Sequence, residues 1–187
     1  MLMSLGVLVV AAACSGSVRL SHDLARLDSI AYSTPLATEL GRRALEAART
    51  HELQSGFLVL DSGEDALLDR LALIEAAQRS LDLQYYIWNS DVTGRYLAAR
   101  VYAAAERGVR VRILLDDFNT GGRDAVLGAL DAHPQIEMRI YNPIGRDAPR
   151  WLGMIRDFSR INRRMHNKSL TADGAATIIG GRNLGDE

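Results

Sequence analysis

The sequence predicts an α/β fold in which a mainly parallel sheet is flanked by helices on both faces. Segments rich in β-branched and aromatic residues alternate along the chain with segments whose apolar residues recur every three or four positions. Such alternation is typical of parallel strands joined by helical crossovers. The composition, with 48% hydrophobic and 24% charged residues in a chain of 187, is that of a globular protein with one folded domain.

The first four elements are two helices and two strands. Residues 36–51 combine good helix formers with an apolar stripe and predict a helix. The short apolar run 56–60 (GFLVL) predicts a strand, because it is bounded by glycine and by turn-forming residues. Residues 64–80 repeat apolar positions at three and four and predict an amphipathic helix, and residues 81–88 then predict a strand.

The alternation continues toward the C-terminus. Residues 93–107 predict a helix, and residues 109–116 (VRVRILLD) predict a strand. A further helix is expected at 123–132 and a further strand at 136–141. This order of elements is the basis for the predicted sheet with flanking helices.

The most specific feature of the chain is a His, a Lys and an Asp spaced HxKxxxxD, with two glycines and an Asn following at short intervals. The bare triplet would occur by chance in roughly one chain of this length in a hundred, and the three later residues lower that to on the order of one in a million. The residues are His166, Lys168, Asp173, Gly180, Gly181 and Asn183.

This spacing suits chemistry on a phosphate. If residues 165–172 form a strand, the side chains of His166 and Lys168 share one face, with Cα atoms about 6.5–7 Å apart. A neutral imidazole can attack phosphorus and form a covalent phosphohistidine. The Lys168 ammonium and the Asn183 amide can stabilise the charge that develops on the phosphoryl oxygens. The sequence contains no cluster with metal-ligand spacing, so we expect neither a metal nor another cofactor.

Simpler interpretations exist for the same residues. Asp173 and Gly174 lie between two apolar runs and predict a tight hairpin turn, so the main role of Asp173 is expected to be turn formation and support. His166 and Lys168 could belong to an ordinary polar strand face. Gly180 and Gly181 could end a strand, although the lack of side chains would equally allow the backbone to approach a phosphate.

The N-terminus predicts export. The apolar run 5–13 is too short to span a membrane but suits the core of a signal peptide. It ends in Ala-Ala-Ala-Cys, which resembles a bacterial lipoprotein cleavage box and would make Cys14 the lipid anchor. No Lys or Arg precedes the run, so an uncleaved interfacial anchor and a plain cleaved signal remain alternatives. Each option places the protein at a membrane or beyond it, and we expect it in the bacterial cell envelope, associated with a membrane on the periplasmic or outer face.

The expected organisation is a signal or lipoprotein segment at 1–17, a tether with an N-terminal helix at 18–55, and the folded domain at 56–187. Charge is nearly balanced, with 22 Lys and Arg against 23 Asp and Glu. No strong positive field is therefore expected, and we expect no nucleic-acid partner. Cys14 is the only cysteine, which excludes a disulfide within the chain.

Beyond the HxKxxxxD motif, four runs resemble the N-terminal half of two-motif bacterial cardiolipin synthases of the phospholipase D superfamily. They are LDLQYYIWNSDVTG, ERGVRVRILLDDFNT, LDAHPQIEMRIYNP and RINRRMHNKS. The resemblance implies an α-β-α sandwich with a mixed, mainly parallel sheet, and metal-independent chemistry. Because family members carry two such halves, each with one HKD motif, it also implies a fragment, truncated at the C-terminus and inactive by itself.

The resemblance further implies the reaction. His166 attacks the phosphodiester of a phospholipid such as phosphatidylglycerol, while Lys168 and Asn183 hold the phosphate. The hydroxyl of a second lipid then attacks the phosphohistidine to make cardiolipin. The general acid in this superfamily is the His of the second motif, which would be supplied in cis downstream or by a homodimer partner.

Three functions remain open at this point. The first is the N-terminal half of a cardiolipin synthase-like phosphatidyltransferase. The second is a single-motif phospholipase or nuclease that forms its site across a homodimer. The third is a non-catalytic, membrane-anchored domain that binds lipid or a partner.

Three other groups of residues are candidates for the site. Asp116 and Asp117 follow a predicted strand at its carboxyl end, where ligands bind in α/β sheets, although helix capping is the simpler role. The aromatic residues Tyr85, Tyr86 and Trp88 could line a lipid groove or belong to the core. Residues 151–165 are amphipathic and could lie on an anionic membrane or pack on the domain. Arg163 and Arg164, the arginines nearest the motif, are expected to contact the substrate phosphate.

Overall fold

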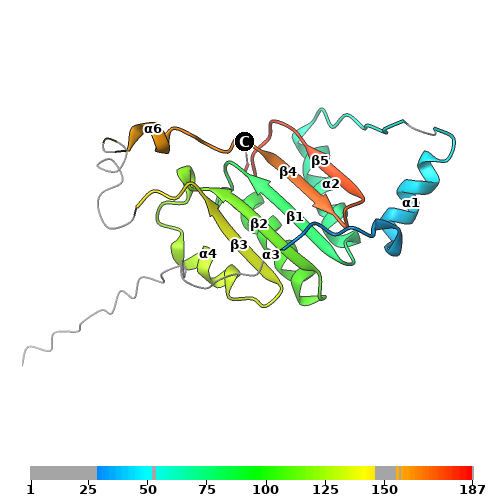
Figure 1. The fold of residues 1–187 in the computed structure, drawn as a ribbon, viewed down its shortest axis with the longest axis horizontal. Helices are drawn as coiled ribbons and strands as arrows, with labels where there is room; N and C mark the ends of the chain where they lie inside the picture. The colour runs from blue at the N-terminus through cyan, green and yellow to red at the C-terminus, as the bar shows by residue number, and fades with distance from the viewer. Residues whose placement is uncertain (1–28, 52–53, 146–154, 156, 187) are drawn as a thin grey trace, which may run out of the picture.

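A single sheet of five strands organises the molecule in this computed structural model, which describes residues 29–51, 54–145, 155 and 157–186 (Figure 1). The strand order is β3-β2-β1-β4-β5. β1 pairs with β2, and β2 with β3, in parallel, whereas β4 is antiparallel to both β1 and β5. The predicted α/β class with a mixed sheet and flanking helices is confirmed. The strands are β1 (Ser80–Tyr85), β2 (Arg110–Asp116), β3 (Ile136–Tyr141), β4 (Lys168–Ala172) and β5 (Ala176–Ile179).

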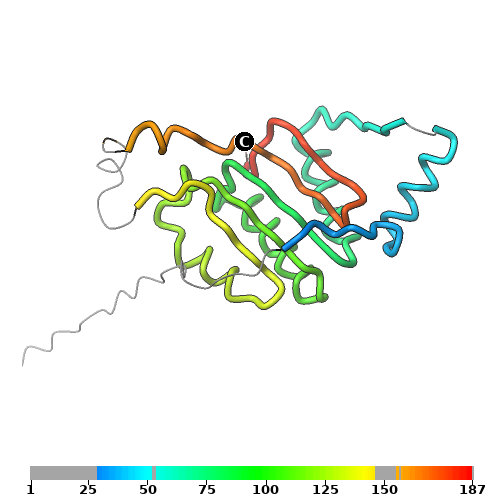
Figure 2. Tube along the Cα trace, in the orientation of Figure 1, coloured from blue at the N-terminus to red at the C-terminus, as the bar shows by residue number. Residues whose placement is uncertain are grey.

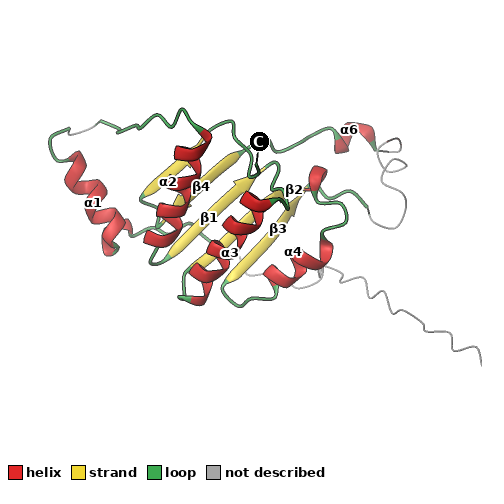
Figure 3. Cartoon of the chain, turned by 180° about the vertical axis from the view of Figure 1, so that it is seen from behind, coloured by secondary structure: helices red, strands yellow, loops and turns green. Residues whose placement is uncertain are grey.

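Helices α2, α3 and α4 lie together on one face of the sheet, as the view from behind shows (Figure 3). On the opposite face, the carbonyl oxygen of Ser29 accepts a hydrogen bond from Arg112 of β2. The sequence predicts helices on both faces of the sheet, but α2, α3 and α4 all cover the same face. The helical segments are η1 (Pro35–Ala37), α1 (Glu39–Ala48), α2 (Gly63–Ala76), α3 (Val92–Glu106), η2 (Asp117–Asn119), α4 (Asp124–Asp131) and α6 (Phe158–Ile161).

The alternation of side chains along the strands explains why these helices share one face. Leu81, Leu83 and Ile113 are buried in the core, whereas the intervening positions are only partly buried. Among these intervening residues, Asp82 and Arg112 form an ion pair across β1 and β2. A strand that is buried on both faces would carry a nearly continuous apolar run, and these strands do not.

The strand predicted at 56–60 is wrong. The segment has no regular secondary structure and no ladder partner among the described residues, and Phe57, Leu58 and Val59 are 90%, 80% and 84% exposed. Apolar composition alone cannot make a strand, because the backbone must also find a hydrogen-bonding edge. A groove lined by residues 56–60 and 176–182 separates the segment from β5.

The other predicted elements are present with shifted ends. The helix expected at 36–51 begins at Glu39, because Pro35–Ala37 forms a 3₁₀ turn and the Thr38 side chain accepts from the Gly41 N–H as the N-cap. Within the amphipathic stretch predicted at 151–165, the described residues are helical at Phe158–Ile161. Residues 151–154 and Arg156 lie outside the described residues.

Candidate functional site

The HxKxxxxD motif begins at the edge of the sheet where β1 and β2 end. Because β4 runs antiparallel to β1, Lys168 at the start of β4 pairs with Tyr85 at the end of β1. Asp116, the last residue of β2, accepts a hydrogen bond from the N–H of Met165 at 2.8 Å. The topology therefore brings the first part of the motif to the carboxyl ends of the parallel strands, where α/β sheets place their ligands.

His166 and Lys168 surround one aromatic ring, that of Tyr86. The ring centroids of His166 and Tyr86 lie 4.9 Å apart, and Lys168 Nζ lies 5.2 Å from the Tyr86 centroid. Lys168 Nζ also donates to the carbonyl oxygen of His166 at 3.0 Å. Both side chains therefore lie near the Tyr86 ring, although His166 precedes β4 instead of belonging to it.

His166 and Lys168 differ in burial. His166 is exposed, whereas Lys168 is only 3% exposed. Burial lowers the pKa of the Lys168 ammonium below its ordinary value of 10.5, because desolvation disfavours the charged form. A bound phosphate would offset that desolvation with its own negative charge.

The pKa of Lys168 predicts how anion binding depends on pH. Deprotonation removes the positive charge, so the affinity for tungstate, a phosphate analogue whose charge is constant above neutral pH, should begin to fall at a pH below 10.5. We expect the tungstate affinity to decrease about tenfold or more as the pH rises through the pKa of Lys168, and calorimetric titration measures this decrease. Lys168→Met should bind weakly with no such decrease. If the tungstate affinity of Lys168→Met fell with pH as it does in wild type, the titrating group would be one other than Lys168.

Asp116 anchors the chain that leads into the motif. It is 1% exposed, and besides Met165 its carboxylate accepts from Arg164 Nη1 at 2.9 Å and from the Phe118 N–H at 2.8 Å. The capping role predicted for Asp116 is present, since Asp116 is the N-cap of η2. The contacts with Arg164 and Met165 are additional, and no local sequence pattern indicated them.

The two arginines before the motif have different surroundings. Arg164 also donates from Nη2 to the carbonyl oxygen of Asn142 at 3.0 Å, so its guanidinium is engaged within the fold. Arg163 is exposed. Of the two predicted phosphate contacts, the structure therefore leaves Arg163 as the more accessible one.

The segment after β5 turns back across the start of β4 toward the end of β1 (Figure 2). Gly180 N–H donates to the carbonyl oxygen of Lys168 at 3.2 Å, and Leu184 N–H donates to that of Ile87 at 3.1 Å. Asn183 is thereby carried to the same edge of the sheet, and its buried Oδ1 has no hydrogen-bond partner among the described residues. A Cβ at Gly180 or Gly181 would meet no atom within 4 Å, so the space beside both glycines is open.

Asp173 lies at the other end of β4. Its carboxylate is fully buried and accepts from the backbone N–H groups of Gln78, Arg79 and Ser80 at 3.0, 2.7 and 2.9 Å. Asp173 and Gly174 have φ values of 55° and 60°, which form the tight turn that the sequence predicted. At about 3.4 Å per residue, β4 separates Asp173 from Lys168 by about 17 Å. The fold therefore groups Asp173 with the turn and not with His166.

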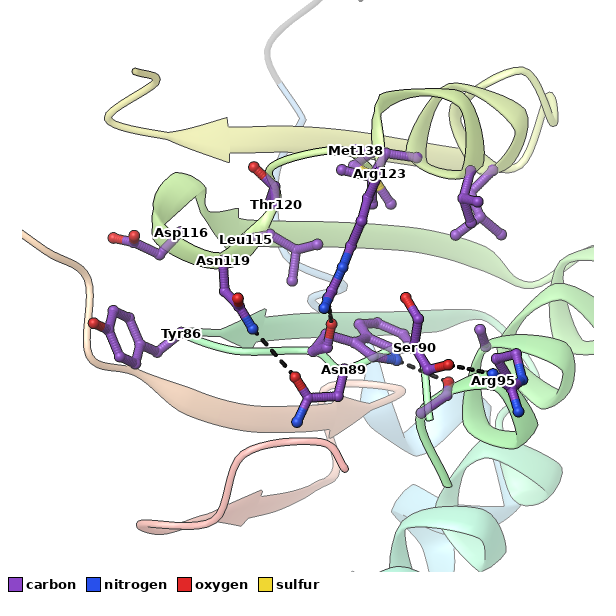
Figure 4. A pocket seen from close by; sticks show the side chains of 16 residues that line it. Tyr86, Asn89, Ser90, Arg95, Leu115, Asp116, Asn119, Thr120, Arg123 and Met138 are labelled. Atoms are coloured by element: carbon purple, nitrogen blue, oxygen red, sulfur yellow. Dashed lines mark hydrogen bonds between the residues drawn. The ribbon is translucent and has the colours of Figure 1, made fainter. Parts of the chain in front are cut away.

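A pocket adjoins the motif on the helix side of β1 and β2 (Figure 4). Its lining includes Leu115, Leu127 and Met138, and Tyr86 and Asp116 belong to the side nearest the motif. Asn119 Nδ2 donates to Asn89 Oδ1 at 3.2 Å across the pocket. Tyr86, which lines this pocket, also contacts His166.

The three aromatic residues of the β1 region serve different purposes. Tyr85 is fully buried in the core, and its hydroxyl accepts from Arg70 Nε at 3.0 Å. Trp88 packs against the core and donates from Nε1 to the Gly94 carbonyl oxygen at 2.9 Å. Tyr86, predicted to line a lipid groove or belong to the core, has in addition a contact with His166 and Lys168 that was not predicted. No local sequence pattern indicated this contact, because Tyr86 follows the last residue of β1 and lies far from His166 along the chain.

Cys14 and the predicted signal segment lie outside the described residues. In the part of the chain that the structure describes, no helix is long and apolar enough to cross a membrane. Within the same ranges, no three His, Cys, Asp or Glu side chains are grouped as the ligands of a metal ion would be.

Comparison with known proteins gives the family. Residues 71–187 match the family described as "Cardiolipin synthase, PLD-like domain". The chain belongs to this family, within the phospholipase D superfamily. Cardiolipin synthase C of Escherichia coli (strain K12) is 52% identical over 147 residues, which cover 79% of this chain and 31% of the relative.

More distant relatives extend the comparison. Cardiolipin synthase B of Shigella flexneri is 33% identical over 130 residues, covering 69% of this chain and 30% of the relative. Among solved structures, NucT from Helicobacter pylori gives a TM-score of 0.47 at 20% identity, over 68% of this chain and 72% of that one. The chain thus spans about a third of the length of the two cardiolipin synthases.

Proposed function

We propose that this chain supplies one half-site for phosphatidyl transfer between phospholipids, with phosphatidylglycerol as the expected donor. One observation carries the proposal: the exposed imidazole of His166 and the buried ammonium of Lys168 both lie near the Tyr86 ring, and Lys168 Nζ bonds the His166 carbonyl oxygen, at the carboxyl ends of the parallel strands. Membership of the cardiolipin synthase family and the 52% identity to cardiolipin synthase C support the choice of substrate class.

The first half-reaction makes a covalent intermediate. A ring nitrogen of neutral His166 attacks phosphorus, and the phosphorus–oxygen bond to the glycerol head group breaks. The departing oxygen takes a proton from a general acid. Lys168 and Asn183, together with the exposed Arg163, stabilise the negative charge on the phosphoryl oxygens. The open space beside Gly180 and Gly181 lets the backbone approach the phosphate.

The second half-reaction transfers the phosphatidyl group. The hydroxyl of a second phospholipid gives its proton to the same group, now a base, and attacks phosphorus while the phosphorus–nitrogen bond breaks. The products are cardiolipin and glycerol. The general acid and base is the His of a second HKD motif, supplied downstream in a longer polypeptide or by a second copy of the chain.

The proposed setting is the bacterial envelope. Cys14 serves as lipid anchor, residues 18–55 tether the domain, and the basic, amphipathic residues 151–165 rest on anionic lipid. The domain at 56–187 then presents His166 to lipids in the membrane surface.

The proposal predicts that activity appears when the second motif is supplied. A fusion of this chain to the part of E. coli cardiolipin synthase C that follows the matched region should convert vesicles of labelled phosphatidylglycerol to cardiolipin and glycerol. The chain without the fused part should be at least about a hundredfold slower if the general acid comes from a downstream motif, and comparably active if a second copy of the chain supplies it. Product analysis by chromatography measures both. A folded fusion that makes neither cardiolipin nor an acid-labile phosphoenzyme would refute the proposal, and phosphatidic acid as sole product would make the enzyme a hydrolase.

A further inference from the structure

We infer that Tyr86 is a positioning residue of the phosphate site, whose ring holds the imidazole of His166 and the ammonium of Lys168 in the arrangement that a phosphodiester meets. This inference rests on the proposed function. Tyr86 belongs to neither the HxKxxxxD motif nor the glycine and asparagine residues that follow it.

The position of the ring is tied to the motif through the backbone. Tyr86 N–H donates to the carbonyl oxygen of Asn167 at 3.0 Å, and Asn167 is the residue between His166 and Lys168. The ring then contacts the side chains on both sides of that bond, at 4.9 Å for His166 and 5.2 Å for Lys168. One residue thus fixes the backbone of the motif and both of its reactive groups.

A second aromatic ring supports Tyr86. Phe118 stacks on it with centroids 5.9 Å apart and an interplanar angle of 19°. The Phe118 N–H donates to Asp116, whose carboxylate also accepts from the N–H of Met165, immediately before His166. The buried carboxylate of Asp116 therefore holds both Phe118, which supports the Tyr86 ring, and the backbone immediately before His166.

An aromatic ring suits an ammonium that must remain available. A face of a π system attracts a cation and partly offsets its desolvation. A carboxylate at the same place would pair with Lys168 and compete with the substrate phosphate. Of the three N–H donors of the ammonium, one is given to the His166 carbonyl oxygen, so donors remain for phosphoryl oxygens.

The imidazole gains orientation from the same contact. An exposed His side chain samples several staggered rotamers, and only those that aim a ring nitrogen at phosphorus are productive. The tilted packing of His166 on Tyr86, at an interplanar angle of 54°, favours one orientation. Loss of the ring should therefore lower the rate of chemistry more than it weakens lipid binding.

The test uses the fusion protein described above, with Tyr86→Leu, Tyr86→Phe and Tyr102→Leu. Tyr86→Leu should lower kcat about tenfold with KM changed less than about threefold, whereas Tyr86→Phe keeps the ring and should stay within about threefold of wild type. Tyr102→Leu is the matched control. The Tyr102 ring packs on His133, with centroids 5.0 Å apart, and lies outside the motif, so its loss should leave kcat unchanged.

Two measurements on the unfused chain are independent of turnover. In NMR spectra, the ring protons of His166 should lose their ring-current shift in Tyr86→Leu and keep it in Tyr86→Phe. Tungstate affinity at pH 7.5 should fall about threefold or more in Tyr86→Leu only. A folded Tyr86→Leu protein with unchanged kcat, His166 shifts and tungstate affinity overturns the inference. Inactivity of the wild-type fusion would instead refute the proposed function, and the two direct measurements would still decide the role of Tyr86.

Discussion

Replacing His166 by Asn should reduce phosphatidyl transfer by the fusion protein on the order of 10⁴-fold or more, because the substitution removes the nucleophile while keeping a polar side chain of similar size. The imidazole is exposed, so its loss should leave the fold intact. The rate of cardiolipin formation and the amount of acid-labile phosphoenzyme trapped by quenching in alkaline denaturant are the two measurements. Both should be lost together, since the intermediate lies on the path to product.

A second histidine provides the control. His51 is exposed and lies outside the site, three residues after the end of α1, so His51→Asn should be as active as wild type. Persistence of the phosphoenzyme in His166→Asn would move the nucleophile to the second motif and make this half the supplier of the general acid. Circular dichroism and thermal unfolding establish that each variant is folded.

Replacing Asp173 by Ala should destabilise the domain by about 3 kcal/mol or more, because a hydrogen bond to a charged acceptor contributes about 1.5–3 kcal/mol and the carboxylate accepts three of them. The donors are backbone N–H groups between the end of α2 and the start of β1, which the change would leave unpaired. Ala is also poorly suited to the φ of 55° at this position. Urea unfolding, followed by circular dichroism, measures the loss.

Asp173→Asn separates support from catalysis. Asn tolerates the left-handed backbone, and its amide oxygen can still accept from the Arg79 and Ser80 N–H groups, so the loss of stability should be smaller than in the Ala variant. Transfer activity per folded molecule should remain within a few-fold of wild type. A large loss of activity in a stable Asp173→Asn protein would contradict the structural role. Asp61→Ala, at an exposed Asp, should change stability by less than about 0.5 kcal/mol.

Most of the fold could be predicted because local signals and tertiary packing agree. The runs that became β1, β2 and β3 alternate apolar and polar residues and are preceded or separated by helical segments with capping residues, such as Ser62 before α2 and Asp91 before α3. The segment 56–60 has the composition of a strand but no ladder partner in the described structure. Strand formation requires a partner edge, and composition carries no information about that edge.

In the site, too, local features could be predicted from the sequence and long-range contacts could not. The spacing of His166 and Lys168 indicated that their side chains would lie together, and the Asp-Gly pair indicated the turn at Asp173. The contacts of Tyr86 with His166 and Lys168 join residues about eighty positions apart, and those of Asp116 with Arg164 and Met165 join residues about fifty positions apart. Local periodicity is silent about such long-range contacts, because they depend on which strands are neighbours.

The sequence by itself determined the α/β class, the HxKxxxxD motif, the turn at Asp173 and the family, because periodicity, turn chemistry and residue spacing act over a few residues. Only the tertiary structure decided that β4 inserts antiparallel beside β1. That pairing buries the Lys168 ammonium, exposes the His166 imidazole and places the Tyr86 ring against both. Burial and contact depend on the whole sheet, and a shift of one residue in its register would turn these side chains to the other face.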